Sequence, residues 1–388
     1  MAPMSTALNP ELTEISIDRL RLRRSAKWAR YPADVLPAWV AEMDFPLAEP
    51  VRLALAEAVQ ADDCGYAAPE ELGLAEAFAG FAEDRLGWWV DPEAVSPSSD
   101  VVGAITAVLR AIAKPGERVV INTPVYHPFF AVVEELGCKL AEAPLADGEL
   151  DPEAIEQRFA EGAVALILCS PHNPTGGVPS REQLAAIADA AARHGAWVLA
   201  DEIHAPLTLP GARHVPLLTI SEAAAERGIA FCSASKTFNV AGLHCAQIIT
   251  ASEKGAEVVE GLPFSATHCG HMGAIASVAA FSDGGPWLDD VIAVLDHNRG
   301  LLAELLSEHL PEVGYAQPRA GYLAWLDLRA LDLGEDPSLA ILEQGRVALS
   351  PGPSFGRQGA GFARLNIGTS PALLEQAVEG IVRVAGRG

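Results

Sequence analysis

Four polar side chains of different types each follow a short apolar run, and together they could carry out amine chemistry. Lys236 follows the run 229–232 and stands among the small hydroxyl residues Ser233 and Ser235. A lysine is usually solvated, but an amine at the end of a buried strand can form a Schiff base with a carbonyl compound. The other positions offer a carboxylate, an amide and an aromatic ring: Asp201 after 196–200, Asn173 after 163–169 and Tyr126 after 118–122.

These four groups are the types that pyridoxal phosphate requires. Lysine can hold the cofactor as an imine and later move the substrate Cα proton, and a carboxylate can keep the pyridine nitrogen protonated. An amide can bind the ring oxygen, and an aromatic face can stack on the ring. The phosphate needs hydroxyls and backbone N–H groups at a helix start; the candidates are Ser233, Ser235, Val101 and Val102.

The elements that must position these groups alternate along the chain between short apolar runs and longer amphipathic ones. This alternation is typical of a parallel α/β sheet. Nearly continuous apolar runs predict strands that are covered on both faces, at 118–122, 163–169, 196–200, 229–232 and 247–250. Between the second and third of these, Ser180 and Gln183 have the spacing of a capping box, and Gly195 ends the helix. Ligands of such sheets bind beyond the carboxyl ends of the strands, so we expect the four groups to share one crevice.

The distribution of apolar and amphipathic stretches along the chain predicts an α/β fold of two parts. A large domain over 46–286 contains the mostly parallel sheet covered by helices, and a long helix over 287–310 opens a smaller α+β domain that reaches residue 388. The N-terminal segment 1–45 contains little strand signal, and we expect it to pack with the smaller domain. A chain of 388 residues is long enough for this division.

Composition excludes several functions. A formal net charge of −24 argues against a nucleic-acid partner, because phosphate backbones require a basic footprint. No apolar run approaches the roughly 18 to 20 residues of a membrane helix, and no secretory signal opens the chain, so we expect a cytoplasmic protein. The six cysteines are scattered without metal-ligand spacing, which favours buried, reduced thiols and no metal site.

Several motifs spread along almost the whole chain resemble a known family. They are Lys27-Trp28, the stretch 36–45, Gly65-Tyr66, the stretches 124–129, 171–176, 201–204 and 233–239, and Arg364-Leu365-Asn366. The chain resembles the fold-type I pyridoxal-phosphate enzymes of the class I and II aminotransferase group. Within that group it is similar to the MalY/PatB branch, the cystathionine β-lyase-like C–S lyases.

The resemblance implies a role for each matching residue. Lys236 is the Schiff-base lysine, Asp201 the partner of the ring nitrogen, Asn173 the contact to the ring oxygen and Tyr126 the stacking ring. Arg364, with Ala41 and Tyr126, belongs to the substrate side, since the arginine fork suits a carboxylate. A tyrosine at the place of Tyr66 reaches the neighbouring subunit's cofactor phosphate in this group, which implies a homodimer with shared sites. His204 either lines the pocket or is a structural histidine.

Two residues depart from the branch. Glu42 stands where the branch usually has aspartate, and Asp100 stands beside the phosphate turn where glycine is common. A carboxylate aimed at a phosphate would be unfavourable. We therefore expect Asp100 to cap the helix and to leave the Val101 and Val102 amides for the phosphate.

The expected reaction is β-elimination from an S-substituted L-cysteine such as cystathionine, which yields a thiol, pyruvate and ammonia. Removal of the Cα proton is common to transamination as well. An aminotransferase, or a specialised pyridoxal-phosphate lyase or oxidase of secondary metabolism, therefore remains an alternative. A regulatory role through protein contacts also stays open, and the motifs do not identify the natural thiol leaving group.

Overall fold

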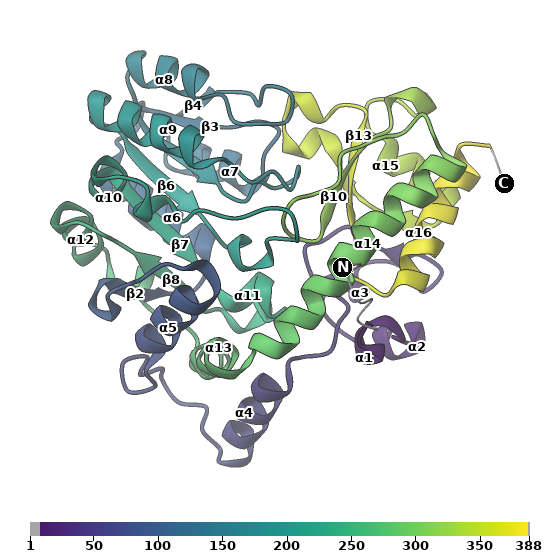
Figure 1. The fold of residues 1–388 in the computed structure, drawn as a ribbon, viewed down its shortest axis with the longest axis horizontal. Coiled ribbons are helices and arrows are strands. Elements are labelled where there is room, and N and C mark those ends of the chain that lie inside the picture. Colours follow the sequence, from purple (N-terminus) through teal and green to yellow (C-terminus); the bar gives the residue numbers. More distant parts are fainter. Residues whose placement is uncertain (1–7, 387–388) are drawn as a thin grey trace, which may run out of the picture. The chain divides into compact units, whose positions relative to one another are not determined.

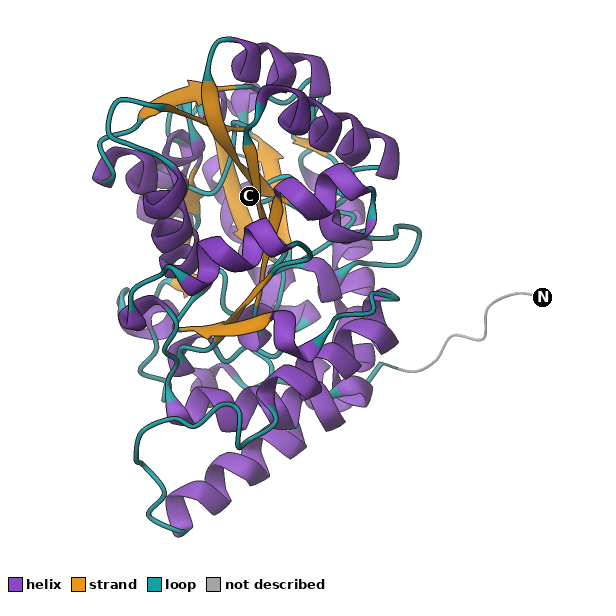
Figure 2. Cartoon of the chain, turned by 90° about the vertical axis from the view of Figure 1, so that its left-hand side faces the viewer, coloured by secondary structure: helices purple, strands orange, loops and turns teal. Residues whose placement is uncertain are grey.

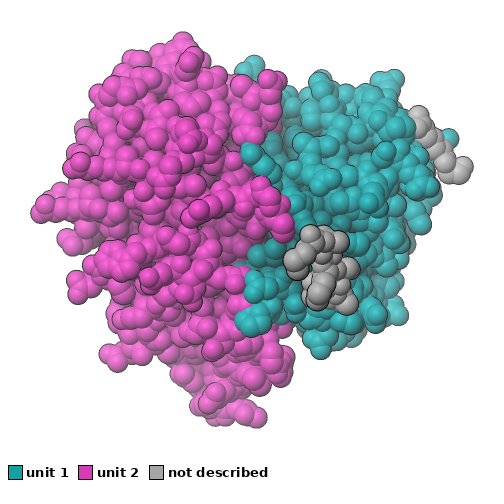
Figure 3. Space-filling model, viewed as in Figure 1, with its two compact units in different colours: residues 1–46, 174–176, 286–388 teal, residues 47–173, 177–285 magenta. Residues whose placement is uncertain are grey.

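The computed structural model describes residues 8–386, and within them the chain divides into two compact units (Figure 3). One unit takes residues 8–46, Pro174–Gly176 and 286–386, and the other takes Leu47–Asn173 and Gly177–Gly285. We call them the terminal unit and the central unit. The domain limits expected from the sequence stay a prediction, and each unit is described here by itself.

The central unit is built around a sheet whose strands, among the described residues, follow the order β2-β8-β7-β6-β5-β3-β4 (Figure 1). The pairs β3–β4, β3–β5, β5–β6 and β6–β7 are parallel, whereas β8 runs antiparallel to both β7 and β2. The fold class predicted from the sequence, a mostly parallel sheet covered by helices, is therefore confirmed. The strands are β2 (Val95–Ser98), β3 (Arg118–Ile121), β4 (Lys139–Glu142), β5 (Ala163–Cys169), β6 (Trp197–Asp201), β7 (Gly228–Cys232) and β8 (Ala246–Ile249).

Helices cover both faces of this sheet (Figure 2), because alternate side chains of a strand point to opposite faces. In β5, Ala165 and Ile167 join an apolar cluster with helices α6, α7 and α12, whereas Leu166 and Leu168 join a second cluster with α8, α9 and α10. Burial on both sides explains the continuous apolar runs. These helices are α6 (Val101–Ile112), α7 (Pro128–Glu135), α8 (Pro152–Ala160), α9 (Arg181–His194), α10 (Glu222–Arg227) and α12 (Glu253–Glu260).

Local signals set the ends of the helices. The capping box predicted at the start of α9 is present: the Ser180 side chain accepts from the Gln183 N–H, and the Gln183 side chain accepts from the Ser180 N–H. Gly195 then ends α9 with a positive φ of 70°, which glycine adopts without strain. The central unit also contains α4 (Glu49–Gln60), α5 (Leu74–Leu86), α11 (Ala234–Thr237) and α13 (His271–Asp283).

The terminal unit joins the two ends of the chain through a strand pair. Strand β1 (Leu36–Pro37) pairs in parallel with β11 (Val347–Ala348), so the early segment is tied to residues near the C-terminus. A second sheet has the order β12-β13-β10-β9. Its strands are β9 (Gly314–Tyr315), β10 (Leu323–Asp327), β12 (Ser350–Pro351) and β13 (Phe362–Asn366), and the helices are α1 (Pro10–Thr13), α2 (Ile17–Leu20), α3 (Ala26–Ala29), α14 (Gly285–His309), α15 (Pro337–Ala340) and α16 (Pro371–Val384).

Within residues 8–386, no helix is both long enough and apolar enough to cross a membrane.

Candidate active site

The carboxyl ends of three adjacent parallel strands of the central unit, β5, β6 and β7, lie at the same edge of the sheet. Cys169 at the end of β5 is the register partner of Asp201 at the end of β6, and Asp201 is the partner of Phe231 in β7. The ladder continues past the strands, because the Ser170 N–H donates to the Asp201 carbonyl over 2.9 Å. The segments that carry the predicted amide, carboxylate and amine therefore leave the sheet side by side.

Asp201 carries a buried carboxylate, with 4% of the residue exposed. Its Oδ1 accepts from the Ile203 N–H at 3.1 Å. Burial raises the pKa of this carboxyl to about 7, while the positive charge of Lys236 acts in the opposite direction. The predicted amine and carboxylate thus lie close enough to interact electrostatically, in a place where a buried anion favours a cationic partner.

Lys236 lies in α11, the short helix that directly follows β7, and its side chain is partly buried. Ser233 caps this helix: its Oγ accepts from the Ser235 N–H at 3.0 Å and lies 2.7 Å from the Ser235 hydroxyl. The Ser233 hydroxyl also donates to the Cys245 carbonyl over 2.6 Å. The two predicted phosphate-binding hydroxyls therefore lie together, three residues and one residue before Lys236.

The start of α6 provides backbone N–H groups near the apolar core of the same unit. Asp100 is the N-cap, and its Oδ1 accepts from the Gly103 N–H at 2.8 Å. The prediction that Asp100 caps the helix is confirmed. Its side chain is turned onto its own helix, and Val101 and Val102 occupy the first two helical positions. These positions have no partner within the helix for their N–H groups.

The amide and the aromatic ring are positioned by the loops after β5 and β3. Asn173 is buried, and its backbone N–H donates to Cys169 Sγ at 3.4 Å. Tyr126 is partly buried against the core cluster, and its ring meets that of Phe129 edge-on with centroids 5.7 Å apart. His204 is buried at 5% exposure, directly before a short 3-10 helix at Ala205–Leu207.

The residues predicted for the substrate carboxylate belong to the terminal unit, where they share one cluster. Arg364 in β13 is buried, and its guanidinium donates to the Trp39 carbonyl and to Ser350 Oγ, each at 3.1 Å. The Arg364 guanidinium also lies over the Phe355 ring, 4.9 Å from its centroid. The Ala41 carbonyl accepts from the Tyr322 hydroxyl at 3.0 Å. Arg364 and the segment of Ala41 are therefore fixed to each other.

Tyr66, unlike these residues, is almost fully exposed. It lies between α4 and α5 with 94% of its surface exposed. Tyrosine is enriched where the surfaces of two proteins meet. The setting suits the predicted contact with a second subunit.

The donor set of the central unit fits pyridoxal phosphate. A buried carboxylate with a raised pKa favours a cation such as a protonated ring nitrogen. Two clustered hydroxyls and a helix start favour a phosphate, and the amine of Lys236 can react with an aldehyde. No group of His, Cys, Asp and Glu side chains within the described residues is arranged to hold a metal ion.

Sequence reasoning gave no role to the residues that hold the backbone of Trp39 and Ala41 in place. Ser350 and Tyr322 donate to Trp39 and Ala41 from positions about 300 residues away. Nothing local in the sequence identifies these pairs. Lys27 and Asp44 belong to two of the motifs, Lys27-Trp28 and the stretch 36–45, but the motifs gave neither residue a role.

The fold and the site define a pyridoxal-phosphate type of α/β protein, and comparison with known proteins identifies the family. A family model described as aminotransferase class I and II matches residues 41–381, so the chain belongs to that family. The resemblance inferred from the motifs is confirmed.

Similar proteins match along nearly their whole length. The cystathionine beta-lyase of Corynebacterium glutamicum is 38% identical, covering 97% of this chain and 98% of that protein. Cystathionine beta-lyase PatB of Bacillus subtilis is 36% identical, covering 92% of this chain and 96% of its own length. The crystal structure of cystalysin from Treponema denticola, which contains a pyridoxal 5'-phosphate cofactor, is similar with a TM-score of 0.89 and 27% identity, covering 98% of this chain and 99% of that one.

Proposed function

We propose that the protein is a pyridoxal-phosphate-dependent C–S lyase that eliminates the thiol from S-substituted L-cysteines such as cystathionine. The observation that carries this proposal is the buried Asp201 carboxylate within electrostatic reach of Lys236, at one edge of the central sheet. The similarity to proteins named cystathionine beta-lyase over at least 92% of the chain supports the same reaction.

Each residue of the site has a task in this reaction. Lys236 would hold the cofactor through its amine, and the same amine would accept the proton from the substrate Cα. When bound, pyridoxal phosphate supplies an electron sink for the pair left on Cα. Asp201 keeps the ring nitrogen protonated, because its buried carboxylate is ionised most favourably beside a cation. Asn173 would hold the ring through its oxygen, and Tyr126 would hold it through its face.

The substrate and the phosphate are bound by separate groups. Ser233, Ser235 and the backbone of Val101 and Val102 bind the cofactor phosphate, and Arg364 and the segment of Ala41 bind the substrate α-carboxylate. His204 contributes to the pocket wall. With these ends fixed, loss of the Cα proton is followed by departure of the β-sulfur as a thiolate, and addition of water releases pyruvate and ammonia.

Assembly and location complete the proposal. We infer a homodimer in which Tyr66 of each chain reaches the phosphate site of the other, in keeping with its 94% exposure. A cytoplasmic location agrees with free thiols at all six cysteines, which are typical of reducing compartments. A nucleic-acid partner is disfavoured by the net charge of −24.

The test is incubation of the purified protein with pyridoxal phosphate and L-cystathionine, with thiol, pyruvate and cofactor absorbance followed together. Equal amounts of thiol and pyruvate over many turnovers establish elimination. Conversion of the cofactor to pyridoxamine phosphate without thiol release, reversed by a keto acid, identifies an aminotransferase instead. Aminotransferases belong to the matching family, so this second outcome is a specific competitor. The Lys236→Ala variant is the blank for both reactions.

A further inference from the structure

The segment Trp39–Phe45 has an unusual arrangement of its backbone. Beyond β1 it forms neither helix nor strand, and yet the carbonyl of every residue from Trp39 to Phe45 accepts a hydrogen bond from a side chain of the terminal unit. We call this stretch the carbonyl segment. Because buried carbonyls outside regular structure need such partners, its path is specified residue by residue.

Two of these six donor residues, Arg23 and Lys27, come from the N-terminal part of the chain. The Arg23 guanidinium donates to the carbonyls of Met43, Asp44 and Phe45, at 3.4, 2.8 and 3.2 Å. The Lys27 ammonium donates to the Glu42 carbonyl at 3.1 Å. Two cations therefore hold the second half of the carbonyl segment.

The other donors come from the C-terminal part of the unit. Asn366 Nδ2 lies 2.7 Å from the carbonyls of both Val40 and Glu42 and so bridges the residue between them, Ala41. Its Oδ1 accepts from the Gly368 N–H at 2.7 Å, and the Gly368 carbonyl accepts from the Asp44 N–H at 2.8 Å. This closed circuit holds Ala41 in register with β13, the strand that carries Arg364.

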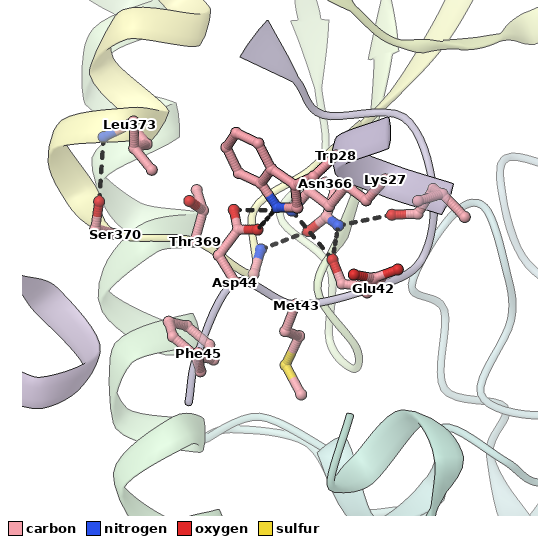
Figure 4. Close-up of polar contacts among 12 residues, drawn as sticks. Lys27, Trp28, Glu42, Met43, Asp44, Phe45, Asn366, Thr369, Ser370 and Leu373 are labelled. Atoms are coloured by element: carbon pink, nitrogen blue, oxygen red, sulfur yellow. Dashed lines mark hydrogen bonds and ion pairs between the residues drawn. The ribbon is translucent and has the colours of Figure 1, made fainter. Parts of the chain in front are cut away.

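Lys27 stands at the centre of this network, and Figure 4 shows it reaching both Glu42 and Asp44 from α3. Its Nζ lies 2.8 Å from Asp44 Oδ2, and the two side chains are 1% and 3% exposed. The Trp28 indole N–H donates to the other oxygen, Asp44 Oδ1, at 2.8 Å. A buried ion pair with this geometry imposes one arrangement on its neighbours, because either charge without its partner is strongly disfavoured there.

We propose that the Lys27–Asp44 ion pair is a positioning device for substrate recognition: it holds the Glu42 and Asp44 backbone so that Ala41 and Arg364 present a single preformed site to the substrate α-carboxylate. The inference rests on the proposed function in one respect, the assignment of Ala41 and Arg364 to the carboxylate. Lys27 touches neither the cofactor nor the reacting atoms in this scheme. It acts through the carbonyl segment and is therefore a positioning residue.

The contacts of Trp39 and Ala41, in the first part of the carbonyl segment, explain why a displacement of the segment reaches Arg364. The Arg364 guanidinium and the Ser350 hydroxyl share the Trp39 carbonyl, and Tyr322 holds Ala41 two residues later. If Lys27 is lost, Glu42 shifts and takes Ala41 with it. Ala41 then moves relative to Arg364, whose guanidinium donates to the Trp39 carbonyl of the same segment. Carboxylate binding should suffer more than proton transfer at Lys236, which belongs to the central unit.

The test compares Lys27→Met with Lys254→Met in the cofactor-loaded protein. Lys254 is the matched control, because it also pairs with a carboxylate, that of Glu226 at 3.2 Å, but on an exposed surface. Each variant is assayed for kcat and KM, for cofactor absorbance and for hydrogen exchange of the amides in residues 39–45. The double variant Lys27→Met/Asp44→Asn removes both charges and keeps an acceptor for Trp28, so it carries the same test if the single variant does not fold.

We expect KM for the amino-acid substrate to rise about tenfold or more in both Lys27 variants, with kcat within about threefold of wild type. Exchange in residues 39–45 should accelerate while cofactor absorbance is unchanged, and Lys254→Met should match wild type. Variants with a lower melting temperature but unchanged KM and unchanged exchange would show a merely structural ion pair and overturn the proposal.

Failure of the proposed function would look different. If the protein transaminates and releases no thiol, the Lys27 effect is still measured as KM for the amino-acid donor, since that substrate also carries an α-carboxylate. If Lys27→Met accelerates exchange but leaves KM unchanged for every amino acid that the wild type turns over, the carbonyl segment does not serve carboxylate binding, and the positioning role is wrong.

Discussion

Cys169 and Asp201 are register partners on adjacent parallel strands, and each lies at the carboxyl end of its strand. The thiol accepts from the Asn173 N–H, and the carboxylate accepts from the Ile203 N–H. One ladder position thus fixes both the loop that carries the predicted amide and the carboxylate itself. The chemistry of the central unit depends on this register, since a slip by one residue would turn Asp201 to the other face of the sheet.

Replacing Lys236 by alanine should abolish turnover, with a loss of about 10³-fold or more, because the variant has no amine to hold the cofactor or to take the Cα proton. Assays of thiol and pyruvate measure the loss, and the visible absorbance of the lysine-bound cofactor should disappear. Lys254→Ala is the control, as Lys254 lies in an exposed ion pair. Wild-type activity in Lys236→Ala would remove this lysine from the mechanism.

The cofactor-free protein should become less stable as the pH rises from about 4 to about 7, because of Asp201. Burial raises the pKa of this carboxyl to about 7, whereas the unfolded value is about 3.9. Between these values the folded chain holds a proton that the unfolded chain has lost, so the free energy of unfolding falls with increasing pH.

Asp201→Asn removes this dependence. Without cofactor, the gain in stability of the variant over wild type should be larger at pH 8 than at pH 5, by about 2–3 kcal/mol. Urea unfolding of both proteins at the two pH values measures the difference. An equal gain at both pH values would mean that Asp201 is already ionised at pH 5. With cofactor and substrate present, the same variant should turn over far more slowly, because the ring nitrogen loses its anionic partner.

Arg364→Lys should raise KM by about 10- to 100-fold with a smaller change in kcat, because lysine keeps the charge but loses the fork that grips a carboxylate. Steady-state kinetics with cystathionine measure the split. Arg329→Lys is the matched control: Arg329 also uses its fork, on Asp327, but its side chain is 66% exposed. A fall in kcat alone for Arg364→Lys would place the arginine outside substrate binding.

Mixing two defective variants tests the shared dimer. In a heterodimer of Lys236→Ala and Tyr66→Phe chains, one site receives both substitutions and the other receives neither. Refolding the variants together at equal amounts should therefore restore about a quarter of wild-type activity, since half of the dimers are mixed. Activity equal to the mean of the two variants alone would show that Tyr66 serves the site of its own chain.

The strands buried on both faces were predictable from the sequence, because their continuous apolar runs leave little ambiguity. The predicted runs at 163–169 and 229–232 correspond to β5 and β7 within a residue. Strands β2 and β4 were not predicted, since their side chains are only partly buried and their sequences, VSPS and KLAE, contain no apolar run. The antiparallel direction of β8 could not be predicted either, because the sequence of a short apolar strand does not indicate its direction in the sheet.

For the site, the ends of the predicted strands led to Asp201, Asn173 and Lys236, which the structure places at or just after the ends of β6, β5 and β7. Their roles stay a prediction. The carbonyl segment was recognised as a motif but not as a network. Its donors Tyr322 and Asn366 lie 281 and more than 300 residues from the carbonyls they bind, and no local pattern encodes such a pairing.

The carbonyl segment also has a consequence for the order in which the protein is made. Residues 39–45 leave the ribosome among the first, but Ser350, Arg364 and Asn366 belong to the last tenth of the chain. The central sheet needs no residue beyond Ile249, so it can assemble during synthesis. Residues 39–45 can therefore acquire all their hydrogen bonds only after the last tenth of the chain has been made. A chain truncated before residue 350 would lack the donors that hold the carbonyls of Trp39 and Val40.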